Sequence, residues 1–104
     1  MPGVARKDKK DTVHSPHGIG PNCSVENIYH TDQGSDNVFV NNIGVVREGD
    51  KMEQHPNVGC DAHSPTLTKY SSNVYANNKK LGRKDDEYDG HVITSASTTV
   101  FANS

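Results

Sequence analysis

The chain has 104 residues, of which 31% are hydrophobic and none is tryptophan, and its mean hydropathy is −0.82. A polar chain of this length has room for one small domain with a thin core, which needs some additional form of stabilisation. The formal net charge of −2 is too small to favour binding to nucleic acid or to an anionic membrane surface. We recognise no signal peptide and no apolar run near the eighteen residues that a membrane-spanning helix needs.

The N-terminal segment, residues 4–14, runs from an apolar pair through Arg6 to His14, eight positions later. The same separation between an arginine and a histidine recurs twice further along the chain, at Arg47 and His55 and at Arg83 and His91. We therefore interpret residues 4–14 as the second half of a repeated unit. Residues 15–36 follow as a long polar connection with two prolines and three glycines, for which we predict no regular structure.

The complete repeat occupies residues 37–55 and returns, without a gap, at residues 73–91. Seven of the nineteen aligned positions are identical, and Phe39 is matched by Tyr75. Each copy has a β-rich run, an Asn-Asn pair, a second short run and a charged bend that ends at a histidine. An Asn-Asn pair between two such runs is typical of a tight hairpin turn, so we predict one hairpin in each copy.

The C-terminal segment, residues 99–103, aligns with residues 37–41 and thus supplies only the first half of a repeat. The two terminal halves would complete a third copy if the ends of the chain meet. We therefore predict an all-β fold without helices, a single domain over residues 1–104, in which three pseudo-three-fold hairpin repeats share one core. The repeat parts are residues 4–14, 37–55, 73–91 and 99–103.

The six histidines and two cysteines of the chain favour a metal site. A structural zinc site takes four histidine or cysteine ligands in a tetrahedron. A site on the pseudo-three-fold axis needs one ligand from each repeat, which predicts His14, His55 and His91. The fourth ligand would come from the H-x4-C-x2-H cluster of the second repeat, as Cys60 or His63, and thiolate chemistry favours Cys60.

Several alternatives to this ligand set stay open. His17 could replace His14, because it lies in a Pro-His-Gly turn of the same repeat. Cys23 and Cys60 could instead form a disulfide, and iron could replace zinc. We expect His30 to lie on the surface. The sequence has no phosphate-binding loop, no Ser-His-Asp arrangement and no HExxH motif, so we predict that the protein is not an enzyme.

The repeat resembles the PAAR-repeat family, the spike-tip proteins of contractile phage tails and type VI secretion systems. The resemblance extends over residues 2–103. The features that carry it are the Val-Ala-Arg of residues 4–6, the VVREGD of residues 45–50, the LGRKDD of residues 81–86 and the two strand openings at residues 34–41 and 97–101. The sequence departs from the family pattern because it lacks a Pro-Ala-Ala-Arg tetrapeptide.

The resemblance implies a short cone of β-hairpins with a structural zinc near its apex, held by histidines and cysteine. It also implies that the protein is a monomer whose broad base binds a trimeric β-helical spike protein. The cone would then sharpen the spike for transient penetration of a target membrane. The expected location is the tail spike tip of a virion or, alternatively, a bacterial type VI secretion apparatus that reaches the extracellular space on firing. A free-standing zinc-binding module or a small zinc hydrolase is the alternative function.

Overall fold

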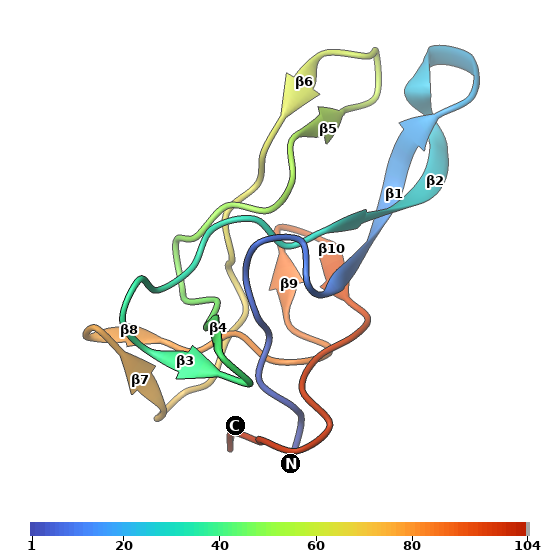
Figure 1. The fold of residues 1–104 in the computed structure, drawn as a ribbon. Helices are drawn as coiled ribbons and strands as arrows, with labels where there is room; N and C mark the ends of the chain where they lie inside the picture. The colour runs from blue at the N-terminus through green and yellow to red at the C-terminus, as the bar shows by residue number, and fades with distance from the viewer. Residues whose placement is uncertain (104) are drawn as a thin grey trace.

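The computed structural model describes residues 1–103, and its regular secondary structure consists almost entirely of short β-strands (Figure 1). There is no α-helix between Met1 and Asn103, and one 3-10 turn, η1, interrupts the strands. The all-β prediction is therefore confirmed. The elements in chain order are β1 (Thr12–Ile19), η1 (Pro21–Cys23), β2 (Val25–His30), β3 (Phe39–Val40), β4 (Ile43–Gly44), β5 (His55–Pro56), β6 (Ala62–His63), β7 (Tyr75–Ala76), β8 (Lys79–Lys80), β9 (Glu87–Tyr88) and β10 (His91–Ile93).

The strands form one four-stranded antiparallel sheet and three separate two-stranded hairpins. The sheet has the order β2-β1-β10-β9, so an N-terminal strand pairs with a C-terminal one. The hairpins are β3–β4, β5–β6 and β7–β8. The prediction that residues 15–36 lack regular structure is wrong, because β1 and β2 pair with each other around η1 and a register shift between Ser15 and Ile19 accommodates the glycine-rich part.

The two ends of the chain lie side by side, as Figure 1 shows. Gly3 bridges Phe101, and the amide of Val4 donates to the carbonyl of Val100 at 3.0 Å. The amide of Ala102 donates to the carbonyl of Pro2, also at 3.0 Å. The prediction that the termini meet is therefore confirmed as a set of backbone contacts.

The β3–β4 and β7–β8 hairpins turn on two consecutive asparagines each. Asn41 and Asn42 have φ of 53° and 65°, and Asn77 and Asn78 have φ of 55° and 64°. Positive φ at both central residues is the mark of a type I′ turn, whose twist matches that of the flanking strands. Asparagine tolerates this left-handed conformation better than other residues with a Cβ atom. The predicted Asn-Asn hairpins are confirmed.

Three backbone hydrogen bonds close a ring among the residues that precede the three repeated arginines. The amide of Ala5 donates to the carbonyl of Gly82 at 3.0 Å, and the amide of Gly82 donates to the carbonyl of Val46 at 2.8 Å. The amide of Val46 completes the ring by donating to the carbonyl of Ala5 at 3.0 Å. Three segments that are far apart in the sequence are thus joined in a cycle, each donating to the next.

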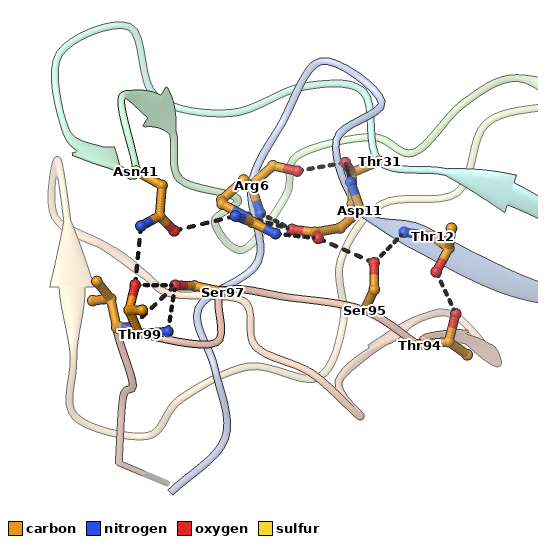
Figure 2. Close-up of polar contacts among 10 residues, drawn as sticks. Arg6, Asp11, Thr12, Thr31, Asn41, Thr94, Ser95, Ser97 and Thr99 are labelled. Atoms are coloured by element: carbon orange, nitrogen blue, oxygen red, sulfur yellow. Dashed lines mark hydrogen bonds and ion pairs between the residues drawn. The ribbon is translucent and has the colours of Figure 1, made fainter.

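Each repeated arginine forms the same set of polar contacts. Its backbone amide and its guanidinium both donate to one nearby carboxylate, and the remaining guanidinium nitrogen reaches an asparagine oxygen of a hairpin or of the C-terminal segment. Figure 2 shows the first set, in which Arg6 lies between Asp11 and Asn41. The three sets are Arg6, Asp11 and Asn41; Arg47, Asp50 and Asn77; and Arg83, Asp86 and Asn103.

The buried apolar residues form two thin clusters, in agreement with the prediction of a thin core. One cluster lies under the four-stranded sheet and comprises Ala5, Val13, Val46, Met52, Leu67, Tyr88 and Ile93. The other takes two matching positions from each copy of the repeat, the two terminal parts together making one copy, and comprises Val4, Val40, Val45, Ala76, Leu81 and Ala102. The molecule is elongated, with extents of 39 × 23 × 21 Å. The termini and the β3–β4 and β7–β8 hairpins lie at one end, which we call the base, and the β1–β2 and β5–β6 hairpins extend to the other, which we call the tip (Figure 1).

Candidate metal centre

Four histidines converge beneath the tip. His17 comes from β1, His55 from β5, His63 from β6 and His91 from β10. One ring nitrogen from each histidine can be chosen such that all four lie within 4.8 Å of one another. His55 and His91 are each only 3% exposed, whereas His17 and His63 are half-buried. The pairing of β5 with β6 places His55 directly opposite His63.

The Nε2 atoms of His55, His63 and His91 lie close together in this cluster. The Nε2 atom of His55 lies 3.1 Å from that of His91 and 2.8 Å from that of His63. The ring of His17 lies 5.1 Å from the rings of His63 and His91, measured between centroids. The four imidazoles thus surround one point from three different hairpins or strand pairs.

Backbone carbonyl groups orient three of the four rings. The Nδ1–H of His55 donates to the carbonyl of Glu53 at 2.9 Å, and that of His91 donates to the carbonyl of Tyr88 at the same distance. The Nδ1 of His17 lies 3.3 Å from the carbonyl of Pro56. Because a carbonyl can only accept, Nδ1 must carry the hydrogen in each case. In the neutral rings Nε2 is therefore the atom with a free lone pair, and this tautomer is the one that second-shell carbonyl contacts commonly fix at metal sites.

Burial lowers the pKa of two of the four histidines in the cluster. Burial lowers the pKa of His63 to about 4, and repulsion from the other three rings adds to the effect. Burial also lowers the pKa of His55, although its hydrogen bond to the Glu53 backbone acts in the opposite direction. Neutral imidazole is the form that binds a metal ion. Near pH 7 these two rings are therefore ready to act as ligands.

The cluster fits a four-coordinate transition-metal ion. With Zn–N distances of 2.0–2.1 Å, the nitrogens of a tetrahedral site lie about 3.3 Å apart. The separations of 2.8 and 3.1 Å and the outer limit of 4.8 Å lie on both sides of this value. Imidazole donors suit zinc, copper, iron and nickel, and they do not favour calcium or magnesium.

The structure brings together three of the predicted ligands, His55, His63 and His91, and does not bring His14 to the cluster. The Nε2 of His14 instead lies 3.1 Å from the carboxylate of Glu26 on the outer side of the sheet. Side chains alternate between the two faces of a strand, so Val13 and Ser15 point inward while His14 points outward. His17, which the sequence offered as the alternative, lies in the cluster.

The error at His14 has a local cause. The partner carboxylate lies three positions after Arg47 and Arg83 but five positions after Arg6. The N-terminal turn is therefore two residues longer, and a count from the arginine ends too early. A count from the aspartate places the ligand near position 16, and the register shift in β1 leaves His17 to occupy the site.

Cys60 cannot serve as a metal ligand in this structure, because its sulfur forms a disulfide with Cys23. Cys60 lies in the turn between β5 and β6, and Cys23 ends η1 between β1 and β2. The preference for Cys60 over His63 as the fourth ligand is thus wrong, and the alternative of a Cys23–Cys60 disulfide holds. His30 is partly exposed, and its Nδ1 lies 3.1 Å from the carboxylate of Glu53.

No protein-family model matches this chain, and comparison with curated proteins gives no match. None of the described residues belongs to a helix long and apolar enough to cross a membrane. The function must therefore be argued from the site and from the arrangement of the repeated contacts.

Proposed function

We propose that the protein is a structural tip, stiffened by a metal ion, for the central spike of a contractile injection machine. The observation that carries the proposal is the convergence of four imidazoles, from three different hairpins or strand pairs, beneath the tip of an elongated molecule. A tip that transmits force must be rigid. A metal ion held by side chains of several hairpins supplies rigidity where a thin core cannot.

The proposed overall form is a cone with pseudo-three-fold symmetry, closed by the two termini. Three observations support it: the ring of hydrogen bonds among Ala5, Val46 and Gly82, the three repeated arginine contacts, and the core cluster with two matching positions per repeat. A cone of this kind presents three similar faces around one axis. It can therefore match the end of a trimeric β-helical spike with one copy per spike.

The base carries the surface that suits such a partner. Phe39, Tyr75 and Phe101 occupy matching positions of the three repeat parts and are 57%, 55% and 48% exposed. Large apolar side chains that stay exposed in a small polar protein mark interaction surfaces, and aromatic residues are enriched at the centres of interfaces. We therefore propose that these three aromatic residues, which we call the base triad, contact the three chains of the spike.

The proposed metal is zinc in a structural role. Four imidazoles saturate a tetrahedral site, whereas a catalytic zinc keeps one position open for water. The role of such a site would be mechanical: through a bound ion, His17 would hold β1, His55 and His63 the β5–β6 hairpin, and His91 β10 at a common point. The proposal includes no enzymatic activity. A zinc hydrolase would use only three of these histidines as ligands.

The proposed site of action is the tail spike tip of a virion or the spike of a type VI secretion apparatus, with transient contact with a target membrane. Neither nucleic acid nor a second copy of the chain takes part. Three apolar side chains, those of Ile19, Val25 and Val58, are exposed on the two hairpins of the tip. Such exposed apolar side chains are compatible with brief passage through lipid.

The test is to mix the protein with the trimeric β-helical spike protein encoded by the same genome and to measure the stoichiometry by native mass spectrometry. The proposal expects one copy per trimer, and the triple substitution F39S/Y75S/F101S should abolish the complex. I28S is the matched control, because Ile28 is similarly exposed on β2, away from the base. Three copies per trimer, or no difference between the triple variant and the control, would contradict the proposal.

A further inference from the structure

The disulfide at the tip joins the two hairpins that carry most of the metal ligands. Cys23 belongs to η1 at the end of the β1–β2 hairpin, on whose first strand His17 lies. Cys60 lies in the turn of the β5–β6 hairpin, which carries His55 and His63. One covalent bond thus links the structural units that supply three of the four imidazoles.

Apart from the contacts among the aromatic and histidine rings, few interactions join these two hairpins near the tip. They belong to different sheets, and none of the residues of η1 is buried. The amide of Gly59 donates to the carbonyl of Asn22 at 2.9 Å, and His17 contacts the carbonyl of Pro56. The apolar clusters draw on neither turn. Without the disulfide, the distance between the hairpin ends would depend on these few polar contacts and on the stacking of Tyr29 against His55, whose ring centroids lie 4.5 Å apart.

We propose that the Cys23–Cys60 disulfide and the four-histidine site are thermodynamically coupled, so that the oxidised protein binds its metal ion more tightly than the reduced protein. The inference rests on the proposed metal site and adds to it a redox-dependent affinity. The disulfide holds His17 near His55 and His63 before the ion arrives, so less conformational entropy is lost on binding. In the reduced protein, this entropy is lost when the ion binds, so the affinity is lower.

The coupling must act in both directions. If the disulfide increases metal affinity by a given factor, the bound metal favours the disulfide over the two thiols by the same factor. Thiols stay reduced in the cytosol, whereas disulfides persist in oxidising surroundings outside it. In the proposed spike-tip protein, the disulfide and the metal ion would therefore stabilise each other after the protein leaves a reducing compartment.

Reduction also releases two thiols, and this gives the opposite hypothesis a definite form. A thiolate is a strong zinc ligand. If Cys60 could join the site once it is freed, the reduced protein would bind zinc more tightly than the oxidised one. The sign of the change on reduction therefore decides between pre-organisation by the disulfide and replacement of a ligand.

The test is to measure the zinc affinity of the full chain by chelator competition, in the oxidised state and after reduction with a water-soluble trialkylphosphine. The phosphine takes the oxygen of one water molecule to become a phosphine oxide, and the two hydrogens of that water end on the two cysteine sulfurs. A dithiol reductant is unsuitable because it binds zinc itself. We expect affinity to fall about tenfold or more, within the usual range of coupling between two sites.

Two variants support the measurement. C23S/C60S should bind zinc as weakly as the reduced wild type, while N42A, which strains a distant hairpin, should bind as tightly as the oxidised wild type. If a cysteine variant fails to fold, the rate at which the phosphine reduces the oxidised wild type gives a second measure, and saturating zinc should slow it.

The possible failures are distinguishable. If the oxidised protein binds no zinc, the proposed metal site itself is wrong. If zinc binds with equal or higher affinity after reduction, or if C23S/C60S binds as tightly as the oxidised wild type, the coupling is wrong while the metal site stands.

Discussion

The Nε2 atoms of His55 and His91 lie 3.1 Å apart, although each ring uses its Nδ1 hydrogen on a backbone carbonyl. Two neutral rings in this tautomer direct lone pairs at each other and have no hydrogen to share. A cation between them removes the repulsion, either as a proton, which the burial of His55 disfavours by lowering its pKa, or as a metal ion. This arrangement is the physical reason to expect an ion at the point where the four rings meet.

His17 and His14 provide the sharpest test of the ligand set. H17A should reduce zinc affinity by at least about tenfold because it removes one of four imidazoles, each positioned by its surroundings. H14A should leave the affinity unchanged because His14 contacts Glu26 outside the cluster. Both affinities can be measured by chelator competition at pH 7.5. A larger loss in H14A than in H17A would restore the ligand set expected from the arginine count.

The metal-free protein should lose stability in acid as His63 takes up a proton. The pKa of His63 is lowered from 6.5 to about 4 in the folded state, so the unfolded chain binds the proton more readily. The stability contributed by the neutral ring is complete above about pH 6.5 and is lost as the pH falls towards 4. Thermal unfolding of the chelator-treated protein between pH 8 and pH 4 should show this decline, and H63Q should flatten it. A melting temperature that rises over this interval would contradict the assignment.

Removing one partner of a repeated arginine pair should be costly. Arg83 and Asp86 are 8% and 6% exposed, and R83A leaves the carboxylate of Asp86 buried without its partner. The expected loss in the free energy of unfolding is about 3–5 kcal/mol. D36A, which breaks the ion pair of an exposed carboxylate with Lys7, should cost less than about 1 kcal/mol. Urea unfolding of the two variants checks the difference, and equal losses would contradict it.

The Asn-Asn turns should tolerate glycine better than alanine. Asn42 is exposed and has a φ of 65°, so N42A forces a Cβ-bearing residue without a compensating polar side chain into the left-handed region. The expected cost is about 1 kcal/mol, whereas N42G should be close to neutral. Urea unfolding again gives the comparison. If N42A and N42G have the same stability, backbone conformation does not explain the asparagine at this position.

The gap-free repeat allowed much of the fold to be predicted. The Asn-Asn pairs specify turns by local conformation, so the β3–β4 and β7–β8 hairpins could be expected from residues 37–55 and 73–91 alone. The alignment of residues 99–103 with the first repeat also led to the contact between the termini. By contrast, β1 and β2 could not be predicted, because their pairing depends on partners across η1 and on β10, and their own residues show no sustained apolar periodicity.

Only part of the ligand set could be predicted from the sequence, for a similar reason. His55 and His91 each lie eight positions after a repeated arginine. His63 pairs with His55 across a short hairpin. The position of His17 depends on two additional residues before Asp11 and on a register shift in β1, neither of which the spacing from Arg6 reveals. Whether Cys60 binds a metal ion or forms a disulfide depends on where the β1–β2 hairpin ends in space. Nothing near Cys60 in the sequence specifies that position.

The central claim is that these four histidines form a closed structural metal site. The most direct test is the zinc content of tag-free protein by elemental analysis, measured together with the melting temperature for the wild type, H55A and H91A. We predict one zinc per chain in the wild type, and loss of both the zinc and a large part of the thermal stability in each variant. Wild-type protein without metal, and with a melting temperature that neither substitution lowers, would contradict the claim.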